Sequence, residues 1–319
     1  MKRCVILDDY QNAALSSADW SPLQGRVEIE RIGEYLGSED AVVQRLADAE
    51  IVMIMRERTP ITASLLARLP KLELLVTSGM RNAAIDLAAA KAQGVMVCGT
   101  ASSPIPPMEL AWGLILGLAR RIIPENQAFR DNGPWQSSVG TDLAGARLGI
   151  VGLGKIGSKM AGIAKAFGME ALAWSPNLTD ERAAAAGVER ARSKQELMER
   201  SDFVSIHLVL SASTRGLIGA DDLRRMKPSA FLINTSRAAI VDEAALITAL
   251  RENWIAGAGL DVFETEPVPA DHPYRRMPHL LATPHLGYVS RSNYHGYFGE
   301  GVEDILAWLE GQPVRILSA

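Results

Sequence analysis

The fold class predicted from the sequence is α/β, with two doubly wound parallel-sheet domains and a cleft between them. Short apolar runs of strand length alternate with segments of helical periodicity in both halves of the chain. Parallel strands need a crossover between them, usually a helix, so this alternation predicts parallel sheets covered by helices. A proline cluster, Pro104, Pro106 and Pro107, separates the two series, and 319 residues suffice for two domains of ordinary size.

The first series supplies four strands and three helices. Its expected strands are residues 5–7, 51–55, 74–76 and 95–97, and its expected helices are residues 41–47, 63–67 and 86–93. The proline cluster interrupts the pattern and predicts a hinge or linker. An apolar helix is expected next, at residues 108–122, where Gly113 and Gly117 would let another helix approach closely. This helix is either an ordinary core helix or, given Trp112, part of an interface.

The second series begins with a strand at residues 148–151 and a helix at residues 155–167. Further strands are expected at residues 171–174, 203–207, 231–234, 257–262 and 280–282, and further helices at residues 179–186, 194–200, 220–226 and 242–251. A last helix at residues 296–309 and a short closing strand at residues 313–317 follow. The second series therefore has the same alternation as the first.

A glycine motif of the form G-x-G-x-x-G distinguishes the second series. Gly152, Gly154 and Gly157 lie where a buried strand turns into the following helix. In such a turn the first glycine permits the tight turn, the second lets a pyrophosphate approach the backbone, and the third lets the helix pack closely on the strand. The helix N-terminus then offers the anion free N–H groups and a positive dipole. In this context the motif predicts a Rossmann-like dinucleotide site.

Composition and charge restrict the classes of partner. The chain is 48% hydrophobic and 22% charged, which is typical of a soluble globular protein. The formal net charge of −4 gives no reason to expect nucleic acid or an anionic membrane as a partner. Cys4 and Cys98 are too few for a disulfide scaffold and lack metal-ligand spacing, so we expect no metal and a reducing, cytoplasmic setting. The longest apolar stretch, residues 110–119, is too short to span a bilayer.

The position that would hold the ribose of a dinucleotide is not acidic. An Asp or Glu about twenty residues after the glycines usually binds the ribose hydroxyls of NAD. At the end of the strand expected there, the chain has Ser175. Glu170 precedes that strand, Asp180 is typical of a helix start, and Arg182 is the nearest cation after Ser175. No carboxylate would repel a 2′-phosphate and no adjacent cation would bind one, so the choice between NAD and NADP stays open.

Three later segments resemble a known family. They are INTSRAAIVDEAAL, GLDVFETEP and LATPHLGY, at residues 233–246, 259–267 and 281–288. With GIVGLGKIG, SGMRNAAIDLAAAKAQGV and NGPW, they resemble the D-isomer-specific 2-hydroxyacid dehydrogenases over most of the chain. The resemblance implies an oxidoreductase, dependent on NAD or NADP, that interconverts a small 2-oxo acid and its D-2-hydroxy acid.

The resemblance implies that Arg237, Glu266 and His285 are catalytic. The planar guanidinium of Arg237 can bind the carboxylate of a 2-oxo acid and polarise its carbonyl. Histidine titrates near neutral pH, so His285 would be the acid for reduction and the base for oxidation. Glu266 would orient the imidazole and favour its protonated form.

Each of these three residues also has a structural interpretation. Arg237 could cap a helix or pair with Asp242. Glu266, before Pro267, could be a surface turn residue, and His285 could be a hydrogen-bonded loop histidine. All three, however, follow the carboxyl ends of expected parallel strands, where open α/β sheets have their sites, which favours the catalytic interpretation.

Further site residues are implied by the resemblance. The expected cofactor-binding residues are Gly152, Gly154, Lys155, Ile156, Gly157, Ser175, His207, Leu208, Thr214, Thr235, Ser236 and Asp261. Of these, Asp261 would accept from the nicotinamide amide, while Thr214 could instead start a helix. The expected substrate-binding residues are Ser78, Gly79, Met80 and Arg237. The first three also fit a plain glycine turn.

The family pattern implies a domain layout. Residues 1–103 and 290–319 would form the substrate-binding domain, and residues 104–289 the dinucleotide-binding domain. The helix after the prolines makes a homodimer the expected assembly. The sequence ends at Ala319 with no region for a carboxy-terminal regulatory domain, which weighs against the phosphoglycerate branch of the family.

Three positions depart from the family pattern. Ala238 follows the expected catalytic Arg where the family has Gly, Asn82 stands where many relatives carry Asp, and Tyr288 stands where they often have a second Gly.

Two other functions are possible on this fold. A redox-sensing NAD(H)-binding regulatory protein stays open as an alternative. A formate dehydrogenase is disfavoured, because those relatives have Gln in place of Glu266.

Overall fold

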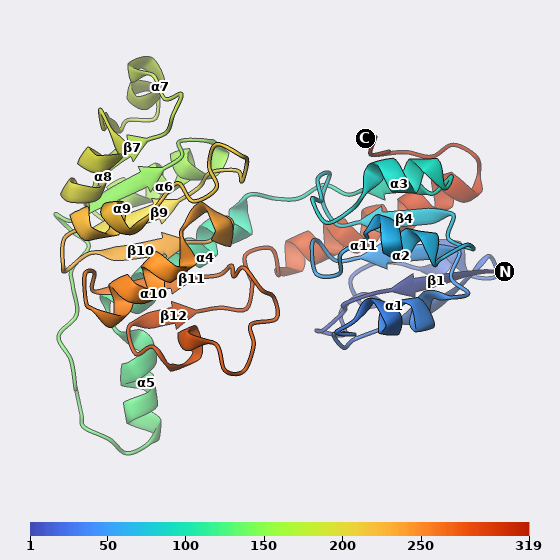
Figure 1. Cartoon of the computed structure of the whole chain (residues 1–319), viewed down its shortest axis with the longest axis horizontal. Coiled ribbons are helices and arrows are strands. Elements are labelled where there is room, and N and C mark those ends of the chain that lie inside the picture. Colours follow the sequence, from blue (N-terminus) through green and yellow to red (C-terminus); the bar gives the residue numbers. More distant parts are fainter. Residues whose placement is uncertain (319) are drawn as a thin grey trace. The chain divides into compact units, whose positions relative to one another are not determined.

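The structure is a computed structural model that describes residues 1–318 (Figure 1). The chain divides into two compact units. Unit 1 comprises Met1–Ser103 together with the chain from Val289 onward, and unit 2 comprises Pro104–Tyr288. Among the described residues, no helix has the length and apolar character needed to cross a membrane.

Unit 1 contains a five-stranded parallel sheet in the order β2-β1-β3-β4-β5. Its strands are β1 (Lys2–Ile6), β2 (Val27–Arg31), β3 (Ile51–Ile54), β4 (Leu74–Thr77) and β5 (Met96–Gly99). Four of them are the strands expected from the sequence. The edge strand β2 was not expected, because its sequence VEIER mixes apolar with charged residues and contains no apolar run.

Helices cover both faces of this sheet. On one face, α1 (Glu39–Leu46), α2 (Ala63–Ala67) and α3 (Leu87–Ala92) pack on side chains that include Val52 and Ile54 of β3. Between those two, Met53 points the opposite way, because successive strand side chains alternate between faces. Its Cε lies only 2.6 Å from where a Cβ would stand at Gly301 of α11 (Arg291–Leu309), so α11 covers the second face.

The two ends of the last segment differ from the sequence-based expectation. Helix α11 begins after its N-cap Ser290, five residues before the expected start at residue 296. The expected closing strand at residues 313–317 is wrong, because the segment forms only one antiparallel bridge, between Ile316 and Cys98. Arg315 has a left-handed backbone (φ 49°) and binds Asp304 of α11, which turns the chain out of an extended path.

Unit 2 contains a seven-stranded parallel sheet in the order β12-β11-β10-β9-β6-β7-β8. Its strands are β6 (Arg147–Val151), β7 (Glu170–Trp174), β8 (Glu189–Arg190), β9 (Phe203–Ile206), β10 (Phe231–Asn234), β11 (Gly257–Leu260) and β12 (Leu280–Ala282). The chain winds outward from β6 to β8 and then in the other direction from β9 to β12. In sheets of this kind ligands bind outside the carboxyl ends of the strands, where the order reverses, here at β6 and β9. Both sheets confirm the predicted fold class of two doubly wound parallel-sheet units.

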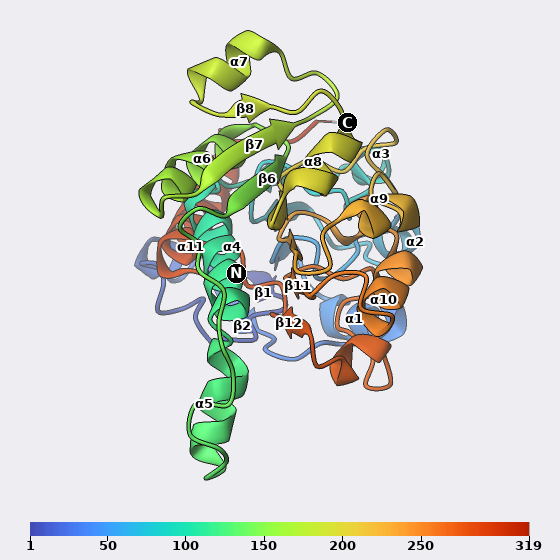
Figure 2. The same ribbon diagram turned by 90° about the vertical axis from the view of Figure 1, so that its left-hand side faces the viewer.

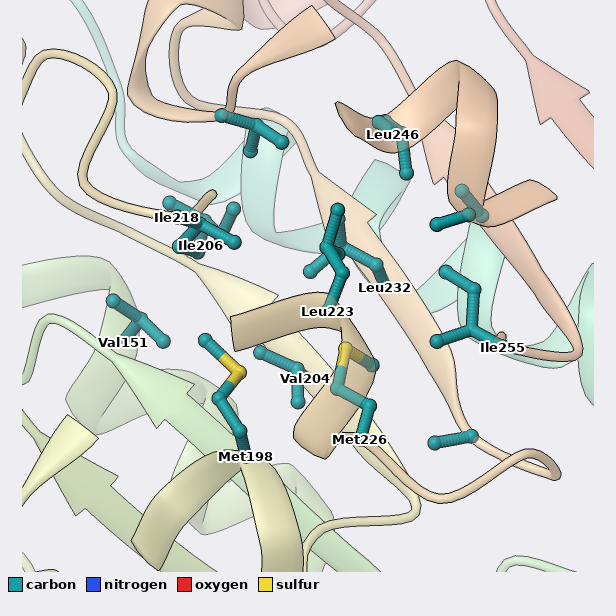
Figure 3. Close-up of a cluster of buried hydrophobic side chains, with 14 of the residues drawn as sticks. Val151, Met198, Val204, Ile206, Ile218, Leu223, Met226, Leu232, Leu246 and Ile255 are labelled. Atoms are coloured by element: carbon teal, nitrogen blue, oxygen red, sulfur yellow. The ribbon is translucent and has the colours of Figure 1, made fainter. Parts of the chain in front are cut away.

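The helices of unit 2 enclose a core on each face of the sheet. They are α4 (Ile105–Ala119), α5 (Ile122–Arg130), α6 (Lys155–Ala166), α7 (Asp180–Ala185), α8 (Lys194–Arg200), α9 (Ala220–Arg225) and α10 (Glu243–Arg251). On one face Met198, Leu223 and Leu246, from α8, α9 and α10, pack on strand residues such as Val204 and Leu232 (Figure 3). On the other face α4 and α6 pack on Leu148 and Ile150 of β6 and on Ile233 of β10.

The proline cluster stands at the boundary between the two units, as expected, but it forms no separate linker segment. Pro106 and Pro107 lie in the first turn of α4, where the N–H groups that proline lacks would have no helical partner anyway. The expected helix at residues 108–122 therefore begins at Ile105, and it ends at Ala119. Arg121 takes a left-handed conformation (φ 49°) between α4 and the unexpected helix α5. Helix α5 extends away from the sheet of unit 2 (Figure 2).

Candidate active site

The glycine turn after β6 has the geometry that a dinucleotide requires. Gly152 has φ +104°, and a Cβ there would lie 2.6 Å from the carbonyl oxygen of His207. A Cβ at Gly157 would lie 2.2 Å from the carbonyl oxygen of Gly152. A Cβ at Gly154, in contrast, would meet no atom within 4 Å. The outer glycines are thus needed for the turn and for helix packing, while the middle one faces open space that a pyrophosphate fits.

The N-terminus of α6 faces the same turn. Gly154 is its N-cap and has no side chain to accept from the N–H groups of the first turn, which Lys155 and Ile156 begin. Those N–H groups and the positive end of the helix dipole favour an anion. The turn and the helix together fit the diphosphate of a nicotinamide dinucleotide.

The loop after β9 lies beside the glycine turn in the sheet order. Burial lowers the pKa of His207 to about 4, so its ring is neutral near pH 7, and Nε2 lies 2.9 Å from Oγ of the buried Ser205. The carbonyl oxygen of Leu208 accepts from the hydroxyl of Ser236 in the next loop. Thr214 is buried and donates to the carbonyl oxygen of Val209 at 2.8 Å, so its hydroxyl fixes the shape of the loop.

The loop after β10 carries Arg237 and is shaped by Asn234. The Asn234 side chain is buried, accepts from the N–H of Ser236 at 3.0 Å and donates to the carbonyl oxygen of Arg237 at 3.0 Å. Arg237 is half-buried, and its Nη1 donates to the carbonyl oxygen of Ser236 at 2.8 Å. Thr235 lies between these bonded residues. The role of Asn234 was missed in the sequence, although an Asn at a strand end is a known signal for such side-chain-to-backbone turns.

His285 and Glu266 form a direct pair. Nδ1 of His285 lies 2.7 Å from Oε2 of Glu266, and the side chains are 21% and 34% exposed, respectively. The other oxygen, Oε1, accepts from the backbone N–H of Phe263 at 2.9 Å. Since the carboxylate accepts, Nδ1 carries the hydrogen and Nε2 is left for chemistry. His285 itself has a left-handed backbone (φ 52°), an uncommon conformation for a residue with a side chain.

Asp261 anchors the loop that carries His285. Its side chain is fully buried; Oδ1 accepts from the Thr283 hydroxyl and the Leu286 N–H, both at 2.6 Å, and Oδ2 accepts from the Gly287 N–H at 2.8 Å. Burial raises the pKa of Asp261, and these three hydrogen bonds oppose the rise. The loop anchor Thr283 was also missed in the sequence, since nothing local marks it.

The sheet order brings the three loops to one edge. β10, β11 and β12 are neighbours, and Arg237, Glu266 and His285 follow their respective carboxyl ends. A guanidinium therefore lies on the loop adjacent to a carboxylate–imidazole pair, a set of groups able to bind an organic acid and to exchange a proton with it.

The comparisons with known proteins agree with this geometry. Residues 112–287 match the model of the "D-isomer specific 2-hydroxyacid dehydrogenase, NAD binding domain". A glyoxylate reductase of Korarchaeum cryptofilum is 34% identical over 86% of this chain and 84% of its own length. A D-3-phosphoglycerate dehydrogenase of Methanocaldococcus jannaschii is 36% identical over 78% of this chain, which spans only 48% of that protein. The solved structure of an oxidoreductase from Ralstonia solanacearum superposes with a TM-score of 0.93, at 39% identity over 99% of this chain and 96% of that one.

The chain belongs to the D-isomer-specific 2-hydroxyacid dehydrogenase family. It is therefore an oxidoreductase of the D-2-hydroxyacid dehydrogenase type, and unit 2 holds the binding domain for its nicotinamide cofactor. The resemblance found in the sequence is thereby confirmed.

One departure from the family pattern lies beside the His285–Glu266 pair of this dehydrogenase. Tyr288 is buried, and its ring packs edge-on against the His285 imidazole, with ring centroids 5.1 Å apart and an interplanar angle of 72°. The aromatic residue thus forms one wall around the imidazole.

In unit 1 of this dehydrogenase, the residues expected to bind substrate are partly engaged within the unit. The Ser78 N–H donates to the Ile54 carbonyl oxygen at 3.2 Å, and the Gly79 N–H donates to the Thr100 hydroxyl at 3.1 Å. Met80 has 46% of its surface exposed. Asn82 is buried and bonds the Thr77 hydroxyl at 2.9 Å, which makes it part of the same loop framework.

Proposed function

We propose that this enzyme interconverts a small 2-oxo acid and its D-2-hydroxy acid, with His285 as the acid and base. The single observation that carries the proposal is the 2.7 Å bond between His285 Nδ1 and Glu266 Oε2. This bond fixes the tautomer and the ring orientation, so Nε2 is the atom that would give a proton to the substrate oxygen in reduction and remove it in oxidation. Glu266 would hold the imidazole in that orientation.

Arg237 would bind the substrate carboxylate. A guanidinium offers two parallel N–H donors that match a carboxylate, and a further donor could polarise the adjacent carbonyl. The Asn234 bonds described above fix the backbone from which Arg237 projects. When bound, the nicotinamide cofactor supplies or accepts the hydride. The protein's part is to bind, orient and exchange the proton.

The cofactor would lie along the carboxyl edge of the unit 2 sheet. Gly152, Gly154 and Gly157, with Lys155 and Ile156, would hold its diphosphate, and Ser175 would face its adenosine ribose. The residues proposed to line the remaining path are His207, Leu208, Thr214, Thr235 and Ser236. For Asp261 we propose a positioning role through the His285 loop, because its oxygens already accept three hydrogen bonds and its side chain has no exposed surface.

The substrate class would be short 2-oxo acids such as glyoxylate or hydroxypyruvate. The glyoxylate reductase among the relatives supports this proposal. Residues 104–289 would act as the dinucleotide-binding domain, and residues 1–103 and 290–319 as the substrate-binding domain, where Ser78, Gly79 and Met80 would contribute.

We also propose a homodimer formed through the α5 segment. Helix α5 has no buried residue, and the apolar side chains of Phe129, Trp135 and Val139 are exposed on and after it. A patch of this kind typically marks an interaction site. Sedimentation of the wild type and of a Phe129→Ser/Trp135→Ser variant tests it: the wild type should sediment as a dimer and the variant as a folded monomer. A monomeric wild type would rule the proposal out.

The catalytic proposal is tested by comparing two histidines. His285→Ala should lower kcat by roughly 10²–10⁴-fold, because the acid and base is lost, while the affinity for reduced nicotinamide nucleotide stays unchanged. His279→Ala is the control, since His279 is a histidine of the same unit that immediately precedes β12 and so lies at the amino edge of the sheet, opposite to His285. The assay follows oxidation of NADH and NADPH with a panel of 2-oxo acids. Wild-type turnover in His285→Ala would remove His285 from the mechanism.

A further inference from the structure

Arg182 reaches back from α7 to the glycine turn. Its Nη1 donates to the carbonyl oxygen of Asn177 and its Nη2 to the carbonyl oxygen of Leu153, each at 3.4 Å. Leu153 lies between the first two glycines of the turn, and Asn177 lies in the loop that follows β7. The guanidinium therefore spans the loops after two different strands, although Arg182 is seven positions beyond Ser175 in the sequence.

These two loops are neighbours in the sheet. β6 and β7 pair in parallel with Val151 opposite Trp174, and the Gly152 N–H donates to the Trp174 carbonyl oxygen at 2.9 Å. In sheets of this type the diphosphate lies on the glycine turn and the adenosine ribose lies at the end of the next strand. The ribose 2′-position therefore falls between the loop of Leu153 and the loop of Ser175, where the Arg182 guanidinium lies.

The charges around this position favour an anion. Ser175 stands where a ribose-binding carboxylate would repel a 2′-phosphate. Asp180 and Glu181 are the carboxylates of the first turn of α7, and Asp180 accepts from Arg190 at 3.0 Å, which offsets its charge. Both carboxylates are exposed, and within residues 1–318 neither they nor any other carboxylate forms an ion pair with Arg182.

The guanidinium also has donors to spare. An arginine has five N–H donors, and the two bonds of Arg182 to carbonyl oxygens leave three uncommitted. The two carbonyl contacts, each at 3.4 Å, direct the guanidinium of this exposed residue toward the space between the two loops. Arginine matches the oxygens of a phosphate with parallel N–H donors.

We infer that Arg182 binds the 2′-phosphate of NADP(H) and that this enzyme prefers NADP(H) to NAD(H). The inference rests on the proposed cofactor site after β6. Arg182 is then a specificity-determining residue that lies outside the strand-end position where sequence reasoning looks for one.

Calorimetric titration with adenosine 2′,5′-bisphosphate and with ADP tests the inference without turnover. The wild type should bind the 2′,5′-bisphosphate roughly tenfold to hundredfold more tightly than the Arg182→Ala variant, as expected for a hydrogen-bonded charge pair. The affinity for ADP should change little, and Arg182→Lys should keep part of the preference. Arg225→Ala is the matched control, because Arg225 is an exposed arginine of the same unit that pairs with Glu199 at 2.7 Å. It should behave as the wild type.

Two outcomes separate this inference from the function on which it rests. If Arg182→Ala binds the 2′,5′-bisphosphate as tightly as the wild type, the inference is overturned. The proposed function would still hold in that case, provided that the wild type oxidises NADH with a 2-oxo acid. If neither NADH nor NADPH binds the wild type, the proposed function fails and the inference fails with it. If Arg182→Ala loses the preference for the 2′,5′-bisphosphate over ADP and Arg225→Ala keeps it, the result supports both the inference and the proposed function.

Discussion

The two sheets of this protein share one architecture and differ at the turns that follow their inner strands. In unit 2 a Cβ at Gly154 would meet no atom within 4 Å, and α6 begins at the next residue. In unit 1 a Cβ at Gly79, after β4, would lie 1.9 Å from Nη1 of Arg56, and α3 begins only at Leu87. A glycine after a parallel strand is therefore no site for a dinucleotide diphosphate by itself. The site also needs open space and a helix N-terminus that faces it.

The largest effect that would test this difference is expected from Gly154→Ala. The added methyl group enters space that is open in the protein, so the free energy of unfolding should change by less than about 1 kcal/mol. It would occupy the space proposed for the diphosphate, so the affinity for NADH and NADPH should fall by roughly tenfold or more. Fluorescence titration and urea denaturation measure the two quantities. Unchanged nucleotide affinity would contradict the proposed cofactor site.

Gly79→Ala provides the counterpart in unit 1. Its φ of +95° and the close Arg56 guanidinium make the methyl group unfavourable, so the stability should fall by about 1–3 kcal/mol. The affinity for nicotinamide nucleotides should stay at the wild-type value. A loss of affinity equal to that of Gly154→Ala would mean that the two turns do not differ in the way proposed.

Much of unit 2 could be predicted from the sequence because most of its strands are short and mainly apolar, the exception being the unexpected β8, which consists of Glu189 and Arg190. The expected bounds of β10, β12 and α8 coincide with those in the structure. Where apolar residues were sparse or mixed with charges, as in β2 and α5, the same reasoning found nothing. The closing strand failed because the segment forms a single bridge and no ladder, and its apolar residues Val314 and Ile316 are 41% and 50% exposed.

The candidate site, like the fold, could be predicted from the sequence only in part. The residue types and their places after strand ends can be identified from the sequence, which is why Arg237, Glu266 and His285 were candidates. The local Asn234 turn has a signal in the sequence, but the contacts of Asp261 and Arg182 could not be predicted, because each depends on a side chain that reaches backbone atoms far away along the chain. Sequence spacing contains no information about such directions.

A second comparison concerns two buried aspartates, one in each unit. Both oxygens of Asp261 in unit 2 accept hydrogen bonds, whereas of the two oxygens of Asp304 in unit 1 only Oδ1 accepts one, from Arg315 Nε at 2.8 Å. Oδ2 of Asp304 is buried and has no hydrogen-bond partner among residues 1–318. Burial raises the pKa of Asp304 from the usual 3.8 to about 7, although Arg315 opposes the rise.

The unpaired Asp304 oxygen predicts a stability that depends on pH. The Asp304 carboxyl group ionises at a lower pH in the unfolded chain than in the folded one, so its contribution to stability is present below about pH 4 and is lost as pH rises to about 7. The loss would be at most about 4 kcal/mol. Asp304→Asn should abolish this dependence and be at least as stable as the wild type near pH 8, as measured by urea denaturation at several pH values. Parallel pH profiles of the two proteins would contradict the assignment.

The smallest effect is expected from a substitution of Tyr288, whose ring borders His285 at the carboxyl edge of the unit 2 sheet. Tyr288 packs edge-on against His285, and a contact of this kind contributes about 0.5–1.5 kcal/mol. Tyr288→Leu should therefore lower kcat by roughly twofold to tenfold with little change in KM, because the imidazole is less well held. Tyr288→Phe keeps the aromatic ring and should therefore retain most of the wild-type activity. Phe231 is the matched control, since its ring stacks on that of Phe203 at 5.4 Å and both residues begin their strands, at the edge of the sheet opposite to the proposed site, so Phe231→Leu should leave kcat unchanged. If Tyr288→Leu raised KM alone, the ring would act on substrate access and not on His285.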